Sequence, residues 1–164
     1  MRRHLPFILL WSLLWALFFG ALLLGRVRLP DSDLSGQFHT FAMFQAQEMW
    51  AGRLPVWSPG SYGGFPFAAD TQAAVFYLPR WLTILFSGPG GLSYYALELE
   101  GLLHIWLAGV FTYALAFDLT KNRWAGLLAA VAFGLGGYLI SYPLLQLALL
   151  ETITWLPLVL WLLR

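Results

Sequence analysis

Carboxylates that follow directly on an apolar segment are the first candidates for chemistry in this chain. Asp31 and Asp33 come a few residues after the uncharged run 5–25. At a membrane surface such a carboxylate can act as a catalytic base that takes a proton from an acceptor hydroxyl. Asp33 can equally hold a divalent metal, Mg²⁺ or Mn²⁺, because these ions prefer oxygen ligands and bridge phosphates. A solvated pair that caps the following helix fits the same two residues, so the spacing leaves these readings open.

A second set of ionisable groups lies inside an apolar segment. Glu100 and His104 are four positions apart in the run 92–117, so they share one face of a helix there. Ionisable side chains in a membrane are costly and usually face a cavity or a partner. They are candidates for lining a substrate cavity, and the alternative is a satisfied interior histidine beside headgroup-level glutamates.

Arginines and aromatic rings gather between these two sets. Arg53 and Arg80 are candidates for binding a lipid phosphate, because a guanidinium group presents a planar set of donors that matches phosphate oxygens. Arginines that only reach toward lipid headgroups are the alternative. Aromatic rings in the same loop can stack on sugar faces, or can form the belt of rings common at membrane interfaces. These rings are Trp57, Tyr62, Phe65 and Tyr77.

The composition indicates a membrane environment. Of the 164 residues, 60% are hydrophobic and only 10% are charged, whereas soluble domains carry roughly 25% charged residues. Membrane lipid is therefore an expected partner. The formal net charge of +1 gives no reason to expect nucleic acid. Cysteine is absent, which excludes disulfides and cysteine chemistry, and the chain contains none of the common nucleotide-binding or hydrolase motifs.

The elements that must position these residues are predicted to be helices. The run 5–25 has 21 uncharged residues, which as a helix span roughly 31 Å, the thickness of a hydrocarbon core. We predict an all-α polytopic membrane protein, a single membrane domain over 1–164, with three to four transmembrane helices. The predicted spans are about 5–25, 92–117, 124–142 and 144–163. A large loop at 26–91, rich in Gly and Pro and carrying interfacial helices, separates the first two.

Basic residues near the predicted helix ends set the orientation. One side carries Arg2, Arg3, Lys121, Arg123 and Arg164. We expect this side to be cytoplasmic, with the N-terminus on it and the loop 26–91 outside, although Arg26, Arg28, Arg53 and Arg80 lie on the outer side.

Three stretches of the loop are distinctive. They read Ala-Gly-Arg-Leu-Pro-Val-Trp-Ser-Pro over 51–59, Gly-Gly-Phe-Pro-Phe over 63–67 and Asp-Thr-Gln-Ala-Ala-Val-Phe-Tyr-Leu-Pro over 70–79. In this order they resemble the loop of the YfhO-like bacterial membrane proteins, a branch of the polytopic GT-C glycosyltransferases. The likeness runs from about residue 33 to 163 and is most specific in the loop.

The resemblance implies a many-spanning helical bundle in the bacterial cytoplasmic (inner) membrane. It also implies transfer of a sugar from a polyprenyl-phosphate donor to an external acceptor. The family's acidic residue after the first span corresponds to Asp33, with Asp31 as the second candidate, and Gln72 matches the family's glutamine. Asp70 stands where the family often has asparagine, and Gln146 stands where it often has histidine. These positions are expected to contact substrate.

Members of that family have more spans than this chain offers. The chain therefore resembles an N-terminal portion of such an enzyme, and a second membrane chain or further C-terminal helices would complete its cavity. Two alternatives remain open. One is a non-catalytic membrane subunit or scaffold that packs with a partner, and the other is a transporter of lipid-linked sugars.

Overall fold

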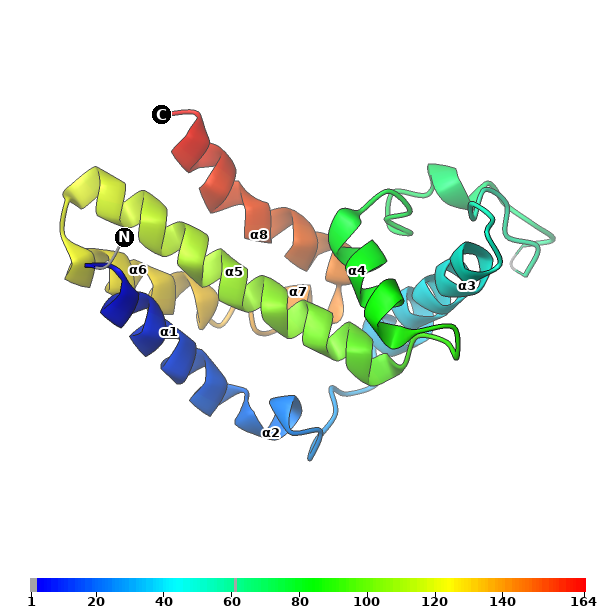
Figure 1. The fold of residues 1–164 in the computed structure, drawn as a ribbon, viewed down its shortest axis with the longest axis horizontal. Helices are drawn as coiled ribbons and strands as arrows, with labels where there is room; N and C mark the ends of the chain where they lie inside the picture. The colour runs from blue at the N-terminus through cyan, green and yellow to red at the C-terminus, as the bar shows by residue number, and fades with distance from the viewer. Residues whose placement is uncertain (1–2, 61) are drawn as a thin grey trace. The chain divides into compact units, whose positions relative to one another are not determined.

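The computed structural model describes residues 3–60 and 62–164, and it is built from helices (Figure 1). Arg2 lies outside the described residues. The chain divides into two compact units, which comprise 1–28 with 101–164, and 29–100. In chain order the helices are α1 (Leu5–Phe18), α2 (Gly20–Leu23), the π-helix η1 (Leu34–Phe38), α3 (His39–Trp50), the 3₁₀ turn η2 (Phe67–Ala69), α4 (Leu78–Ser87), α5 (Tyr94–Thr120), α6 (Arg123–Gly134), α7 (Tyr142–Leu145) and α8 (Leu147–Leu162).

One helix of the described chain, α5, is long and apolar enough to cross a membrane. Its 27 residues extend roughly 40 Å as a helix. The apolar helices α1, α6 and α8 are shorter, at 14, 12 and 16 residues. The helical class predicted from the sequence is therefore present, and the potential to span a membrane rests on α5.

The shorter helices end inside the predicted spans. The run 5–25 is interrupted at Phe19, which separates α1 from α2. The run 124–142 is helical only to Gly134, and turns follow through a glycine-containing stretch; glycine weakens a helix interior because it loses the most backbone freedom on folding. Gln146 adopts a non-helical conformation that separates α7 from α8.

Trp11 is the centre of packing in the first unit. Its side chain is 1% exposed, and the indole packs against Gly109 of α5 and Gly134 of α6. The indole N–H donates a hydrogen bond of 3.0 Å to the carbonyl of Trp106. Glycines at both contacts let the three helices approach the ring closely. Trp15 lies one helical turn after Trp11 in α1, and its indole N–H likewise donates to a carbonyl of α5, that of Leu102, at 3.1 Å.

In the second unit, η1 and α3 form a continuous helical segment that packs on a folded loop. Phe67, at 1% exposure, lies at the centre of a cluster of rings contributed by Phe41, Phe44 and Phe65. Gln45 of α3 is fully buried and donates through its amide to the carbonyl of Val75 at 3.0 Å. Because the buried amide N–H is paired with a backbone carbonyl, it fixes the stretch around residue 75 to α3.

Helix α4 turns large apolar side chains outward, unlike a surface helix of a soluble protein. Its outward face is apolar, with Leu78, Leu82 and Phe86 at 68%, 55% and 90% exposure. Its inward face carries Arg80, which is 1% exposed. The buried face also carries Ile84, so the apolar face turned outward is the feature that distinguishes α4 from a surface helix of a soluble protein.

Candidate functional site

A pocket of about 570 Å³ opens in the second unit between the helical segment η1–α3 and the loop after it. We call it the loop pocket. It combines amide, hydroxyl and carboxylate groups with aromatic rings. Its lining residues are Gly36, Gln37, Thr40, Phe41, Tyr62, Phe65, Asp70 and Gln72.

The polar wall of the loop pocket comes from two segments that are far apart in sequence. Gln37 and Thr40 lie three positions apart, on one side of the helical segment. The Gln37 amide donates to the side-chain carbonyl of Gln72. Asp70 accepts from the backbone N–H of Gln72 at 2.8 Å through Oδ1, which is an Asx turn that holds both side chains at the pocket. Of the residues predicted to contact substrate, Asp70 and Gln72 lie here, together with Tyr62 and Phe65 of the rings that can stack on a sugar.

The aromatic wall is held by a short antiparallel bridge. Ser58 and Phe65 exchange both backbone hydrogen bonds, at 3.0 and 2.9 Å. Gly64 has a φ of +107° and lies directly against the Trp57 indole. A Cβ at this position would be only 2.7 Å from Nε1 of that ring, so a larger residue would clash. Trp57, which is 57% exposed, therefore lies against Gly64 and does not line the pocket.

Tyr62 presents its ring to solvent from a strained position. Its φ is +54°, and its side chain is 98% exposed. A bulky residue in the left-handed region is rare, and such strain concentrates at ligand-binding sites. An exposed ring beside amides and a carboxylate supplies a stacking face together with hydrogen-bond donors and acceptors.

The charge of the loop pocket favours a neutral, hydroxyl-rich ligand. None of its lining residues is basic, and Asp70 is the one carboxylate among them. Among the described residues, no side chain pairs with Asp70 as a counter-ion. A phosphate would meet repulsion from this carboxylate, whereas a hydroxyl would donate a hydrogen bond to it. The pocket therefore suits the sugar part of a ligand better than a phosphate.

Asp31 and Asp33 are exposed and do not line the loop pocket. Asp33 is the residue before η1, and its side chain makes no capping hydrogen bond. The backbone N–H of Leu34 donates instead to the hydroxyl oxygen of Ser32, at 3.3 Å. Asp33 precedes Gln37 by four positions, about one helical turn, so it lies on the segment that leads into the pocket.

Arg80 and Glu100 form a buried ion pair. The Arg80 Nε donates to both carboxylate oxygens at 3.0 Å, and both side chains are 2% exposed. Nearby in sequence, Glu98 accepts from the backbone N–H of Leu29 at 2.7 Å and is also buried. In this arrangement Arg80 and Glu100 satisfy each other, and α4 is tied to the start of α5.

Arg53 is also paired, but at the surface. It donates to both oxygens of Glu48 at 2.8 and 2.7 Å. This hydrogen bonding, with a smaller effect of the positive charge, lowers the pKa of Glu48. Arg53 is 62% exposed along its side chain, so it keeps access to solvent.

His104 and Gln146 lie in the first unit and do not line the loop pocket. His104 is fully buried, and its carbonyl accepts from the hydroxyl of Thr154 of α8 at 3.2 Å. Gln146 is 8% exposed, at the break between α7 and α8. Each is a buried polar position at a helix contact.

Within the described chain, no three His, Asp or Glu side chains are grouped closely enough to hold a metal ion. Asp33 would have to bind a divalent ion together with ligands from outside the protein, such as donor phosphates. Mg²⁺ is often bound in this way, through one or two carboxylates and substrate phosphates.

The chain matches no protein-family model, no curated protein and no solved structure. The loop pocket was not found as a unit by sequence reasoning, which missed Gln37 and Thr40 as site residues. The sequence indicates both residues by their spacing. Gln37 and Thr40 are three positions apart and so share one side of a helix, away from the apolar residues Leu34 and Phe38.

Proposed function

We propose that this chain is a membrane glycosyltransferase, or a part of one, that takes a sugar from a polyprenyl-phosphate donor and transfers it to an external acceptor. The loop pocket is the observation that carries the proposal. It offers a stacking ring, two amides, a hydroxyl and the carboxylate of Asp70, with which no described side chain pairs as a counter-ion. This set of groups suits a neutral sugar ring, because the ring has an apolar face and hydroxyl groups around its edge.

The surroundings of the loop pocket fit a lipid-linked substrate. Helix α4, in the same unit, turns an apolar face outward, and α5 is long and apolar enough to cross a membrane. A sugar attached to a membrane-embedded carrier reaches an enzyme at the lipid surface. The resemblance of the loop to the YfhO-like family agrees with this role, and from it we propose a multi-pass protein of the bacterial inner membrane with the loop outside.

Asp33 is the base in this proposal. It takes the proton of the acceptor hydroxyl, the hydroxyl oxygen bonds to the anomeric carbon, and the bond from that carbon to the phosphate oxygen breaks. The polyprenyl phosphate leaves with the bonding electron pair. Arg53 is an exposed cation of the loop that can approach this phosphate, and it is paired with Glu48 in this structure.

Sugar binding by the purified protein tests the pocket. We expect weak binding of at least one neutral hexose or N-acetylhexosamine, detected by saturation-transfer NMR in detergent micelles. Gln72→Leu and Asp70→Asn should each weaken it about tenfold, because a hydrogen bond to the ligand is lost at ~1.4 kcal/mol. Asparagine keeps the Oδ1 acceptor for the Gln72 N–H, so the turn itself should survive.

Gln47→Leu is the matched control, since Gln47 is an exposed glutamine of α3 outside the pocket. Its sugar binding should equal that of the wild type. Binding that is equally strong in the Gln72→Leu, Asp70→Asn and Gln47→Leu variants would exclude the loop pocket as the sugar site. Absence of binding to every sugar tested would favour a scaffold subunit.

A further inference from the structure

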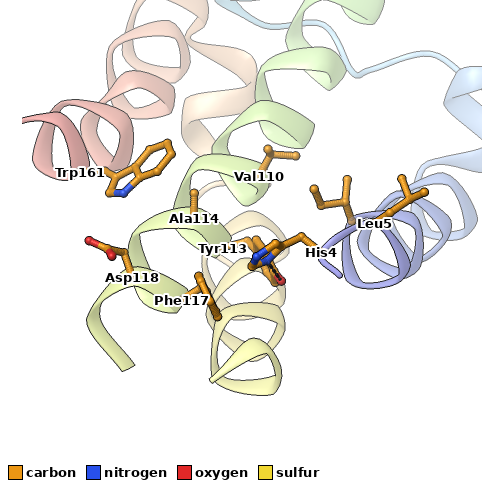
Figure 2. A pocket seen from close by; sticks show the side chains of 9 residues that line it. His4, Leu5, Val110, Tyr113, Ala114, Phe117, Asp118 and Trp161 are labelled. Atoms are coloured by element: carbon orange, nitrogen blue, oxygen red, sulfur yellow. Dashed lines mark hydrogen bonds between the residues drawn. The ribbon is translucent and has the colours of Figure 1, made fainter. Parts of the chain in front are cut away.

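A second, larger hollow lies in the first unit, between the start of α1 and the ends of α5 and α8 (Figure 2). We call it the end groove. Its volume is about 660 Å³. Val110 and Ala114 of α5 form its floor, Leu5 of α1 lies at one side and Trp161 of α8 at the other. The lining is therefore apolar over most of its length.

Two basic side chains lie at the Asp118 end of this groove, which we call its mouth. Asp118 lines the groove and pairs with both Lys121 and Arg164, the latter at 3.0 Å. Lys121 and Arg164 are 69% and 43% exposed along their side chains. Two cations share one carboxylate, so the mouth keeps a positive charge that an anion can approach.

Away from Asp118, the polar side chains His4 and Tyr113 of the groove lining are paired with each other. His4 and the hydroxyl of Tyr113 are hydrogen-bonded at 3.0 Å, as Figure 2 shows. The His4 ring packs edge-on against Phe117, with ring centres 4.5 Å apart. The groove wall thus offers apolar contact below a cationic mouth.

The size of the groove decides between its possible occupants. A helix about 10 Å wide fills ~420 Å³ per turn, so 660 Å³ would hold only about one and a half turns. A partner helix would be poorly buried there. A narrow alkyl chain fits a hollow of this size along its length.

We propose that the end groove binds an anionic membrane lipid, with one hydrocarbon chain over Val110 and Ala114 and the phosphate at Lys121 and Arg164. Basic side chains at a membrane surface attract anionic lipids, and the apolar walls exclude water from the chain. Asp118 competes with the phosphate for the same two cations. The site is separate from the loop pocket and does not depend on the transfer reaction.

Native mass spectrometry of the detergent-purified protein tests this site. With phosphatidylglycerol and phosphatidylcholine of the same acyl chains at equal concentration, we expect the wild type to retain the anionic lipid about fivefold more, since each nearby cation favours it. Ala114→Phe fills the floor and should abolish this retention. Ala132→Phe, an exposed alanine of α6 outside the groove, should not.

Charge variants separate the headgroup contact from the chain contact. Lys121→Gln combined with Arg164→Gln should remove the preference for phosphatidylglycerol, while Arg26→Gln, at an exposed arginine away from the groove, should leave it intact. Asp118→Asn should strengthen it by freeing both cations. Unchanged lipid retention in the Ala114→Phe variant would overturn the proposal. So would a protein dimer that this variant dissociates, because the occupant would then be a second copy.

Discussion

Replacing Gly109 by alanine should lower the free energy of unfolding by about 3 kcal/mol, at the upper end of the usual cost of overpacking. The new Cβ would lie 2.2 Å from the Trp11 ring. That ring also faces Gly134 and is tied by its N–H to the carbonyl of Trp106. It cannot move aside without breaking this hydrogen bond, so α1 and α5 must separate. Equilibrium unfolding in mixed micelles, followed by tryptophan near-UV circular dichroism, measures the change.

Gly20→Ala is the matched control, because a Cβ at Gly20 meets nothing within 4 Å. Its stability should stay within about 0.5 kcal/mol of the wild type. A double-mutant cycle sharpens the test. In a Trp11→Leu background the space around residue 109 is no longer filled by the indole, so Gly109→Ala should cost much less. An equal cost in both backgrounds would contradict the packing described for Trp11.

Breaking the buried pair in the second unit should have the other large effect. Arg80→Gln leaves the Glu100 carboxylate, 2% exposed, without its guanidinium partner. Removal of one member of a buried ion pair costs about 3–5 kcal/mol, because the remaining charge is left uncompensated. Glu100→Gln should cost a similar amount for the same reason. Thermal unfolding of the two single variants and the double variant measures both.

The double variant Arg80→Met/Glu100→Gln removes both charges and should recover much of the loss, since neither partner is left buried alone. Arg53→Gln removes an arginine of an exposed pair and should leave stability unchanged, because solvent screens surface pairs. A loss on Arg80→Gln as small as that on Arg53→Gln would show that the Arg80–Glu100 pair does not hold α4 to α5.

Helices could be predicted from the sequence because a long apolar run in a membrane must pair its backbone N–H and C=O groups within the segment, and a helix does so. The long helix α5 lies over most of the predicted span 92–117, and the loop 26–91 contains helices as expected. Their ends could not be predicted as well. The stop of α6 at Gly134 and the break at Gln146 depend on how neighbouring segments pack, and hydropathy carries no information about that packing.

Part of the loop pocket consists of residues named from the sequence. Asp70 and Gln72 line it, and the resemblance of the loop to the YfhO-like family singled them out. The bond between Gln37 and Gln72 joins positions 35 apart, and the pair of Arg80 and Glu100 joins positions 20 apart. Only the folded chain brings such residues together, so Arg80 was predicted as a phosphate ligand, without its buried partner.

Sugar transfer itself tests the central proposal most directly. The protein, reconstituted in liposomes, is given radiolabelled polyprenyl-phosphate sugars and an acceptor extract from a bacterial envelope, and label in the acceptor is counted. We predict transfer by the wild type, loss of at least about 100-fold with Asp33→Asn, as for removal of a general base, and full activity with Gln47→Leu. Equal transfer by the wild type and Asp33→Asn would contradict the role of Asp33. No transfer from any donor would contradict the proposal that this chain alone is a glycosyltransferase.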